Sequence, residues 1–557
     1  MTAGDLPNMG VPEHLAARMS MAEQHEYLRA KLARRTPRRA SRFSRRDVLA
    51  GGGLAAAGAL GTAGLVIGSD RALGGGGGGA AGSAGPADGT AAPARSPLKV
   101  DGSLVAPFGR HLAFGADPRT RMRISWQVPF AVRNPYVRVG ARPWELDQRV
   151  AAEVRELHTP SLTEDLPDVE QFYLHAALDG LRPGTTYYYG VGHDGFDPAT
   201  AERLGTVGTF TTAPAGTDGR FVFTAFGDQG VGYDALANDQ LILGQNPAFH
   251  LHAGDLCYAD ETGHGKKTDT YDARVWDQFL AQTESVASRV PWMVTTGNHD
   301  MEAWYSPDGY GGQSARWTLP DNGPDAEKAP GVYSFTYGNT GVVALDANDV
   351  SYEIPANRGV TDGAQTRWLE RTLQRMRGEK GIDFVVVFFH HCAYSTSTHA
   401  SDGGVRDAWV DLFERFKVDL VINGHNHVYE RTDPVRGGEP TRKLAVGETT
   451  DPGKDGTVYV TAGGGGKKLY DFPVPDSYEG HEEERESVST FHWTEDKERN
   501  PDRVAWSRVR YTGFSFLAVE SRPGSGPGAR PSLSVTALAA SGKRIDHFVV
   551  EREGKGD

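Results

Sequence analysis

Five short apolar runs after residue 220 each end in polar residues of the kinds that bind metal ions. The runs and the residues that follow them read FVFTAF-GDQG, FHLHA-GDLCYAD, WMVTT-GNHD, FVVVFF-HHCAY and VDLVI-NGHNH. Apolar runs of this length that alternate with helical patterns predict an α/β domain with buried strands. Ligands of such domains gather beyond the carboxyl ends of the strands. The five strand ends therefore predict one pocket that carries carboxylate, amide and imidazole groups.

The last run ends in a His-x-His pair, His425 and His427. Residues two apart on a strand share a face, so both imidazoles can point at one target. Alone, such a pair is more often structural than metal-binding, and a Gly-Asp or an Asn after a strand can be a simple turn. The ordered series GD, GD, GNH, H and GHxH is specific because every member stands at a strand end. It predicts that the histidine pair is one corner of a metal site.

Two segments between these runs have the period of amphipathic helices. Residues 362–378, DGAQTRWLERTLQRMRG, place four apolar residues on one face: Trp368, Leu369, Leu373 and Met376. Asp362 and Gln365 have the spacing of a capping box, which predicts how this helix begins. Residues 404–417, GVRDAWVDLFERFK, predict a second helix directly before the VDLVI run.

Residues 97–214 have a different texture. Short segments such as RMRISWQV and YVRVGAR alternate apolar and polar residues and are broken by Gly, Pro and Asp. This pattern predicts an antiparallel β-sandwich. Trp126 on an early strand and the later LRPGTTYYYGVG segment resemble a fibronectin type III module. In such a module Tyr187 and Tyr189 are expected in the core and at a corner, not in a binding site.

The first 96 residues are expected to lie outside the folded domains. In residues 1–70, Arg45 and Arg46 precede a moderately apolar stretch, which is the layout of a twin-arginine export signal. A transmembrane anchor is the alternative, but the Gly and Ala content makes the stretch weakly hydrophobic. Residues 71–96 are rich in Gly, Ala and Pro and are predicted to be a linker. The protein is therefore expected to be secreted or at the cell surface.

The composition excludes some classes of binding partner and a disulfide-rich fold. The formal net charge is -13, so the protein as a whole is not expected to bind nucleic acid or an anionic membrane, unless a retained signal anchors it. The two cysteines, Cys257 and Cys392, are too few for a disulfide scaffold. Both stand beside candidate metal-binding residues, so a role as soft ligands competes with that of small buried thiols. The oxygen and nitrogen donors already present at the five strand ends favour buried thiols.

The series of strand ends resembles the metallophosphoesterase superfamily and, within it, the purple acid phosphatases. The resemblance implies an α/β metallophosphoesterase fold for residues 219–552, in which a two-sheet β-sandwich is flanked by helices. An all-β fibronectin type III-like sandwich precedes this domain, as it does in many such enzymes. The wider superfamily begins with Asp-x-His, whereas this chain has Gly230 at the histidine position. Tyr258, three residues after Asp255, stands where purple acid phosphatases have a tyrosinate ligand.

The resemblance also implies a centre of two metal ions. Three residues would hold the first ion, ferric iron: Asp228, Tyr258 and His427. Three would hold the second, a divalent Zn, Mn or Fe ion: Asn298, His390 and His425. Asp255 would bridge the two ions. Hard anionic oxygens suit a trivalent ion, while imidazole and amide groups suit a divalent one.

Two further histidines would act on the substrate. His299 is expected to contact the phosphate, and His399 corresponds to a histidine that the family places outside the ligand shell. The family often has His-x-Pro-x-Tyr where this chain reads HHCAY. His390 is assigned as the ligand because Tyr394 keeps its spacing from it, which leaves His391 beside the ligand shell.

The expected activity is hydrolysis of phosphate monoesters to an alcohol and inorganic phosphate, without a phosphoenzyme. Small-molecule phosphate esters are the expected partners. A phosphodiesterase, or a phytate or nucleotide hydrolase of the same superfamily, is an alternative because the motifs leave the leaving group open. An inactive cell-surface binding protein is a remote alternative. The sequence does not specify the oligomeric state.

Overall fold

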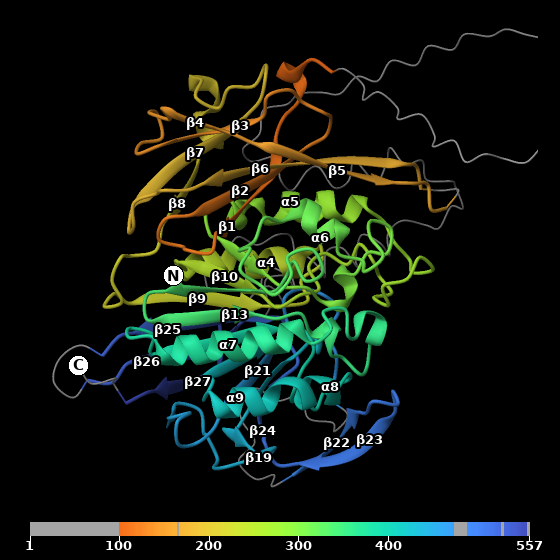
Figure 1. The fold of residues 1–557 in the computed structure, drawn as a ribbon, viewed down its shortest axis with the longest axis vertical. Helices are drawn as coiled ribbons and strands as arrows, with labels where there is room; N and C mark the ends of the chain where they lie inside the picture. Colours follow the sequence, from red (N-terminus) through yellow and green to blue (C-terminus); the bar gives the residue numbers. More distant parts are fainter. Residues whose placement is uncertain (1–99, 164–165, 473–486, 525–528, 554–557) are drawn as a thin grey trace, which may run out of the picture. The chain divides into compact units, whose positions relative to one another are not determined.

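A computed structural model of the chain is built around two seven-stranded β-sheets, with a smaller β-sandwich before them in the sequence (Figure 1). The structure describes residues 100–163, 166–472, 487–524 and 529–553. The signal and linker expected in residues 1–96 lie outside the described residues. None of the helices in the described ranges is both long enough and apolar enough to cross a membrane.

The first eight strands form two antiparallel four-stranded sheets, orange to yellow in Figure 1. One sheet has the order β1-β2-β6-β5, with the bounds β1 Phe108–Phe114, β2 Met122–Val128, β5 Glu153–Thr159 and β6 Val169–Leu178. The other has the order β4-β3-β7-β8, with the bounds β3 Tyr136–Gly140, β4 Gln148–Ala151, β7 Thr186–Gly192 and β8 Gly208–Thr211. The predicted all-β domain is confirmed.

Aromatic residues of this domain have structural roles. Trp126 is fully buried in the core. The Tyr187 hydroxyl accepts a hydrogen bond of 2.9 Å from the backbone amide of Arg182, five residues earlier, in the manner of a tyrosine corner. The buried Tyr189 donates its hydroxyl proton to the Ser288 carbonyl at 2.8 Å. Because Ser288 follows helix α5 (Arg274–Ala287), this bond joins the sandwich to the domain that follows it in the chain.

The first seven-stranded sheet has the order β11-β10-β9-β25-β26-β27-β20. Its strands are β9 Phe221–Phe226, β10 Phe249–His252, β11 Trp292–Val294, β20 Thr449–Thr450, β25 Ser515–Arg522, β26 Ser532–Ala539 and β27 Arg544–Glu551. Strands β9, β10 and β11 run parallel to one another, whereas β25 pairs antiparallel with β9. The three parallel strands therefore bring their carboxyl ends to one edge.

The second seven-stranded sheet has the order β12-β13-β14-β16-β21-β17-β24. Its strands are β12 Tyr333–Tyr337, β13 Thr340–Ala344, β14 Phe384–Phe389, β16 Leu420–Asn423, β17 Tyr429–Thr432, β21 Val458–Ala462 and β24 Ser507–Tyr511. Strands β13, β14, β16 and β21 are parallel. A two-stranded ribbon, β18 Val435–Arg436 with β19 Glu439–Pro440, extends from it.

The two sheets pack against each other. Their inner side chains share one hydrophobic core, in which Leu251 and Met293 come from the first sheet and Val386 and Ile422 from the second. Separate clusters hold the helices on the outer faces. The helices are α4 Tyr233–Gly244, α5 Arg274–Ala287, α6 Gly311–Arg316, α7 Ala364–Gly378, α8 Gly403–Val405 and α9 Asp411–Arg415. The predicted α/β metallophosphoesterase fold, a two-sheet sandwich flanked by helices, is confirmed.

Helix α7 buries its four predicted apolar residues but does not begin with the predicted capping box. Its N-cap is Gly363, with φ of 70°, and no side chain caps it. Gln365 instead accepts from the Asp346 amide at 2.8 Å and donates to the Asp346 carbonyl at 3.0 Å. The Thr361 hydroxyl accepts from the Gln365 amide at 3.2 Å. The capping-box prediction is wrong because the Gln365 side chain bonds to a distant loop.

The helix predicted over 404–417 runs from α8 to α9 through a π-helical turn, Arg406–Val410. The buried Trp409 lies in this turn and donates its indole N–H to the Thr366 hydroxyl of α7 at 3.2 Å. A π turn inserts one extra residue into a helix. Here it coincides with the contact between the two helices.

A hairpin pairs with neither large sheet. Its strands β22 (Val488–Trp493) and β23 (Arg499–Val504) pair with each other, and β22 also pairs with β15 (Ser401–Asp402), at the lower edge of Figure 1. Because β15 begins two residues after His399, the hairpin is fixed beside that histidine.

Candidate metal centre

Five predicted site residues follow the carboxyl ends of parallel strands. Asp228 follows β9, Asp255 follows β10 and Asn298 follows β11. His390 comes directly after β14, and His425 lies two residues after β16. The distances between their donor atoms show that these strand ends meet at one place.

The first cluster of donor atoms belongs to Asp228, Tyr258 and His427. The Tyr258 phenol oxygen lies 3.2 Å from Asp228 Oδ1 and 2.9 Å from His427 Nε2. His427 Nε2 is 3.4 Å from Asp228 Oδ1. The three atoms thus form a tight triangle of two oxygens and one nitrogen, the set expected to hold the first ion.

The second cluster is centred on His390 Nε2. This atom lies 3.2 Å from Asp255 Oδ2, 3.1 Å from Asn298 Oδ1 and 3.2 Å from His425 Nδ1. Donor atoms of Asp228, Asp255 and His390 all lie within 4.8 Å of one another. Asp255 therefore stands between the two clusters, where a bridging ligand would be.

Hydrogen bonds on the far side of each ring fix which nitrogen faces the centre. His390 and His427 donate Nδ1–H to backbone carbonyls at 2.8 and 2.6 Å, and His425 donates Nε2–H to Glu353 at 2.9 Å. The lone pairs of the other three nitrogens then face one another and anionic oxygens. Two such lone pairs 3.2 Å apart repel each other unless a proton or a metal ion lies between them. Such outer hydrogen bonds are the rule for metal-binding histidines, and the donor set fits two cations.

Four of the predicted ligands have a backbone conformation that is unusual for residues other than glycine. Asp228, Asp255, Tyr258 and His425 have φ of 61°, 54°, 59° and 67°. Ten non-glycine residues of the described ranges have positive φ, so the centre holds a large share of them. Backbone strain of this kind is retained where the surrounding structure imposes it, typically at functional sites.

The charged groups of the centre shift one another's pKa values. Burial raises the pKa of Asp255, but the nearby His390 and His299 outweigh it and hold the pKa well below the usual range. Burial lowers the pKa of His390, yet Asp255 raises it to about 9. Burial and then the Asp228 and Asp255 carboxylates raise the pKa of Tyr258 well above its ordinary value. Ionisation of Tyr258 beside two carboxylates therefore requires compensating cations.

Asp300 ties two ligand loops together. Its carboxylate accepts hydrogen bonds from the backbone amides of Asp255, Leu256 and Gly297, at 2.8, 3.0 and 2.9 Å. Burial and then the charge of Asp255 raise the pKa of Asp300 to about 7. The sequence analysis gave this residue no role, although its place at the end of the GNHD segment was a signal.

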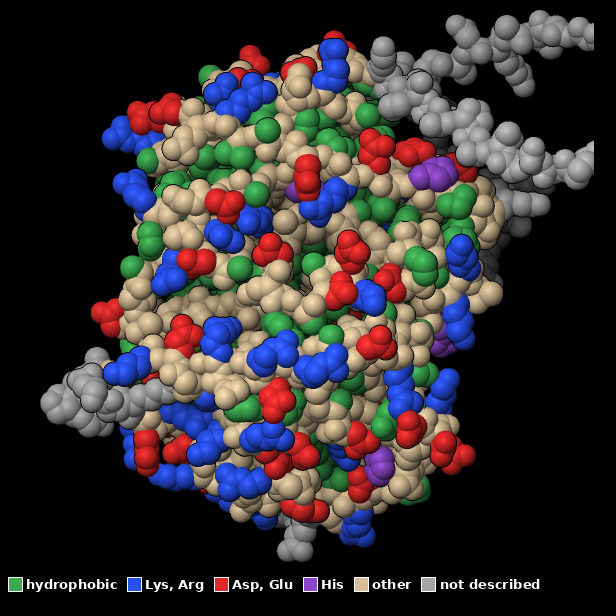
Figure 2. Space-filling view, viewed as in Figure 1, with side chains coloured by type: hydrophobic (Ala, Val, Ile, Leu, Met, Phe, Trp, Pro, Cys, Tyr) green, Lys and Arg blue, Asp and Glu red, His purple; other side chains and the backbone are tan. Residues whose placement is uncertain are grey.

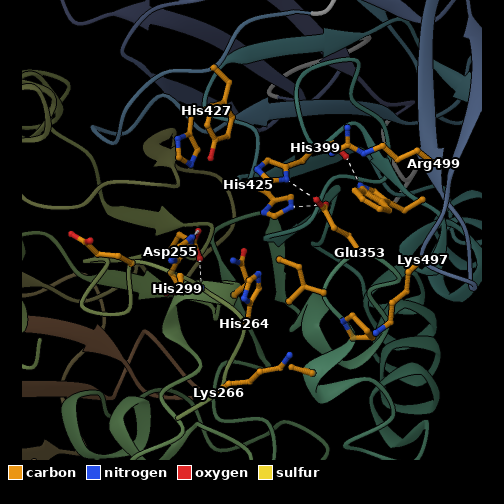
Figure 3. A pocket seen from close by; sticks show the side chains of 18 residues that line it. Asp255, His264, Lys266, His299, Glu353, His399, His425, His427, Lys497 and Arg499 are labelled. Carbon is orange, nitrogen blue, oxygen red and sulfur yellow. Dashed lines mark hydrogen bonds and ion pairs between the residues drawn. The ribbon is translucent and has the colours of Figure 1, made fainter. Parts of the chain in front are cut away.

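The centre opens into a pocket with a volume of about 610 Å³ (Figure 3). His299 lies beside Asp255 and donates Nδ1–H to the Asp260 carbonyl at 2.6 Å. His399 lies on another wall, with its ring centroid 4.2 Å from that of His425. Both predicted substrate-contacting histidines therefore line the same pocket as four of the predicted ligands, Asp255, Asn298, His425 and His427.

Glu353 also lines this pocket and was missed by the sequence analysis. Its carboxylate accepts from His399 Nδ1 at 2.6 Å and from His425 Nε2 at 2.9 Å. Burial raises the pKa of Glu353, while the hydrogen bond from His399 acts in the opposite direction. The residue lies in a loop, and no motif of the sequence marks it.

Three residues next to ligands stay outside the two clusters. The buried Cys392 donates its thiol to a backbone carbonyl at 3.1 Å, and burial raises its pKa to about 12. Burial also raises the pKa of Cys257 well above its usual value. His391 is buried with its ring 4.4 Å from His425. Within the described ranges, neither sulfur belongs to a group of candidate metal donors.

Comparison with known proteins gives two family matches. Residues 107–212 match the model "Purple acid Phosphatase, N-terminal domain", and residues 221–429 match the model "Calcineurin-like phosphoesterase". The second match contains all seven predicted ligands, from Asp228 to His427.

Relatives and solved structures agree with these matches. "Uncharacterized protein Rv2577" of Mycobacterium tuberculosis is 32% identical over 493 residues, which cover 80% of this chain and 88% of that protein. "Purple acid phosphatase 21" of Arabidopsis thaliana is 28% identical over 63% of this chain and 70% of its own. The purple acid phosphatase PPD1 from yellow lupin (Lupinus luteus) seeds shares the fold, with a TM-score of 0.59 at 21% identity over 80% of this chain and 75% of that one. The chain belongs to the purple acid phosphatase family and is a phosphoester hydrolase.

Proposed function

We propose that the protein hydrolyses phosphate monoesters at a centre of two metal ions, ferric iron and divalent Zn, Mn or Fe. The observation that carries this proposal is the pair of adjoining donor clusters, in which outer hydrogen bonds turn three imidazole lone pairs inward. When bound, the two cations would draw charge from the phosphate and lower the pKa of a water molecule.

The two clusters support the ligand roles in this proposal. Three residues would hold the trivalent ion: Asp228, Tyr258 and His427. Three would hold the divalent ion: Asn298, His390 and His425. Asp255 would contribute to both. The anionic oxygens in the first cluster suit the harder ion, and the neutral imidazole and amide donors in the second suit the divalent one.

Two histidines act on the substrate in this proposal. His299 donates Nδ1–H to a carbonyl, and in its protonated form it donates Nε2–H to an oxygen of the phosphate. His399 donates the Nε2 proton to the leaving oxygen as its bond to phosphorus breaks. The oxygen of the attacking water forms the new bond to phosphorus and its proton passes to solvent, from which His399 is protonated again. The products are an alcohol and inorganic phosphate.

The pocket fits small phosphate esters. Lys266, Lys497 and Arg499 line it together with the site histidines, and they attract anionic substrates (Figure 3). Acidic and basic side chains are intermixed over the face of the molecule in Figure 2, so this grouping is local. These three basic side chains favour a second candidate function, hydrolysis of nucleotides or phytate, because such substrates carry further anionic groups.

Three measurements on the purified protein test the proposal. Metal analysis is expected to give two ions per chain, one of them iron. Initial rates are expected to be much higher on an aryl monoester than on the matching diester. A nucleotide or phytate hydrolysed with a far lower KM than simple monoesters would favour the second candidate. A metal-loaded protein that cleaves diesters faster than monoesters would contradict the monoesterase assignment.

We also propose that the first 70 residues direct export by the twin-arginine route, with residues 71–96 as the linker. The Arg45-Arg46 pair before a Gly- and Ala-rich stretch supports it. Fused to a reporter that folds before export, residues 1–96 should carry the reporter out of the cytoplasm. Replacing both arginines by lysine keeps the charge and is expected to abolish export. Equal export of the two fusions would contradict this proposal.

A further inference from the structure

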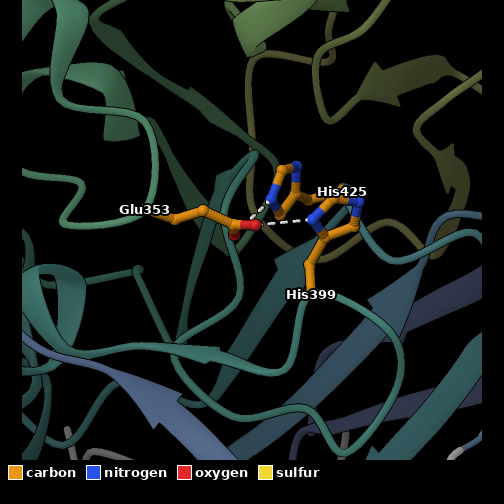
Figure 4. A group of neighbouring side chains, drawn as sticks. All are labelled: Glu353, His399 and His425. Atoms are coloured by element: carbon orange, nitrogen blue, oxygen red, sulfur yellow. Dashed lines mark hydrogen bonds and ion pairs between the residues drawn. The ribbon is translucent and has the colours of Figure 1, made fainter. Parts of the chain in front are cut away.

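One carboxylate connects the metal-binding part of the pocket with its proton donor. Glu353 Oε1 accepts from His399 Nδ1 at 2.6 Å, and Oε2 accepts from His425 Nε2 at 2.9 Å (Figure 4). The Glu353 side chain is 9% exposed. Each oxygen therefore serves a different histidine in a largely buried setting, where hydrogen bonds to a charged group are strong.

The loop that carries Glu353 is fixed to the segment that carries His399. The backbone amides of Tyr352 and Glu353 donate to the Asp402 carboxylate at 3.0 and 3.1 Å, and the Ser351 hydroxyl donates to it at 2.6 Å. Asp402 lies three residues after His399 in the chain. The carboxylate of Glu353 and the ring of His399 are thus held by a shared anchor.

This arrangement determines which nitrogen of each ring is available. Glu353 accepts a hydrogen bond from Nε2–H of His425, which leaves Nδ1 to face His390 Nε2 at 3.2 Å. It accepts another from Nδ1–H of His399, which leaves Nε2–H of the protonated ring for the substrate. A partner of this kind typically changes metal affinity or activity by about 10- to 100-fold when it is removed.

We propose that Glu353 is a positioning residue that sets both the ligand geometry of His425 and the orientation of His399 as proton donor. The inference rests on the proposed function and adds a residue to it. It predicts two separable defects in a Glu353 variant: weaker binding of the divalent ion and poorer protonation of the leaving oxygen.

The experiment compares two substrates on the metal-loaded full-length protein. A glutamine at position 353 cannot accept from both histidines with the strength of a carboxylate. For Glu353→Gln we expect kcat on an alkyl phosphate, whose leaving oxygen needs a proton, to fall about 10- to 100-fold. The fall on 4-nitrophenyl phosphate, whose leaving group is a stable anion, should be much smaller. Dialysis against a chelator should remove the divalent ion from the variant at a lower chelator concentration.

Three variants serve as controls. Glu261→Gln removes the same charge from another wall of the pocket and should leave the ratio of the two rates unchanged. In a His399→Ala background, Glu353→Gln should cause no further loss on the alkyl ester, because its effect on protonation passes through His399. Glu353→Asp keeps the charge with a shorter reach and is expected to recover part of the alkyl-ester rate.

Several outcomes would overturn the inference. An equal fall on both esters with normal metal retention would make Glu353 merely structural, and unchanged kinetics would remove it from the site.

Donor atoms of Glu353, His399 and His425 lie within 4.8 Å of one another, so the alternative is that they hold a third cation. Three ions per wild-type chain and two in Glu353→Gln would establish that reading. Failure of the proposed function is distinguishable, since the wild type would then hydrolyse neither ester.

Discussion

At the scale of single residues, the centre combines strained backbone conformations with hydrogen bonds that fix the orientation of each histidine ring. Four predicted ligands have positive φ. Each of the three ligand imidazoles donates one N–H to an acceptor outside the centre. Left-handed conformations cost non-glycine residues of order 1–3 kcal/mol each. This cost is offset by packing around the site, which leaves the donor atoms preorganised for cations.

Tyr258 gives the first prediction because Gly230, at φ of 65°, offers no side chain to the first ion. Without Tyr258 that ion would have only Asp228, Asp255 and His427. Ferric tyrosinate absorbs visible light, so the iron-loaded protein should be violet to pink. Tyr258→Phe keeps the ring packing, loses the colour and retains some hydrolysis, because the phenol does not attack phosphorus. Absorption spectra and iron content of both proteins provide the measurement. A colourless iron-loaded wild type would remove Tyr258 from the ligand set.

The meeting of the strand-end residues could be predicted from the sequence, whereas the place of Glu353 could not. Parallel strands end at one edge, so a local motif after each strand was enough to bring Asp228, Asn298 and His390 close together. Glu353 reaches partners 46 and 72 residues away from a loop without a repeating pattern. Its role depends on how two loops pack, which no local motif encodes.

At the scale of elements, the β22–β23 hairpin contributes to the pocket wall from beyond both family matches. It pairs with β15 and brings Trp493, Lys497 and Arg499 to the pocket. The Trp493 indole N–H donates to the His399 carbonyl at 2.8 Å. The hairpin therefore supports the loop of the proposed proton donor.

Trp493→Phe tests this support. The substitution keeps an aromatic ring and removes one hydrogen bond, which is worth about 1 kcal/mol net. We expect kcat on an alkyl phosphate to fall about fivefold, in line with that energy, and the metal content to stay at two ions. Ser489→Ala, at an exposed position of the same strand, is the matched control. Kinetics of Trp493→Phe that equal those of the control would show that the hairpin does not act on His399.

Helix α7 shows which of its features the sequence pattern predicts and which it does not. The apolar face of α7 was predicted because its period of burial is a local property. Its capping box was not realised, since Gln365 bonds to both backbone groups of Asp346, 19 residues away. Spacing rules describe an isolated helix end, and a tertiary partner overrides them.

At the scale of the whole molecule, the centre requires the two large sheets to keep their relative position. Asp228 and Asp255 come from the first sheet, and His390 and His425 come from the second. A buried ion pair joins the same two sheets. Arg431 of β17 and Asp546 of β27 have side chains with no exposed surface, and Arg431 Nε donates to Asp546 Oδ2 at 2.5 Å. The pair thus links the second sheet to the first.

Asp546→Asn is expected to destabilise the protein because it leaves the Arg431 guanidinium buried without its counter-charge. Loss of one partner of such a pair typically lowers the free energy of unfolding by about 3–5 kcal/mol. The Tyr429 hydroxyl, which donates to Asp546 at 2.6 Å, would also lose a charged acceptor. Urea unfolding of the metal-free protein measures the change without a contribution from bound ions. Glu370→Gln breaks the exposed pair with Arg415 and should cause no measurable change. Equal stability of the two variants would mean that water solvates Arg431 in the native state. Apolar packing alone would then hold the two sheets together.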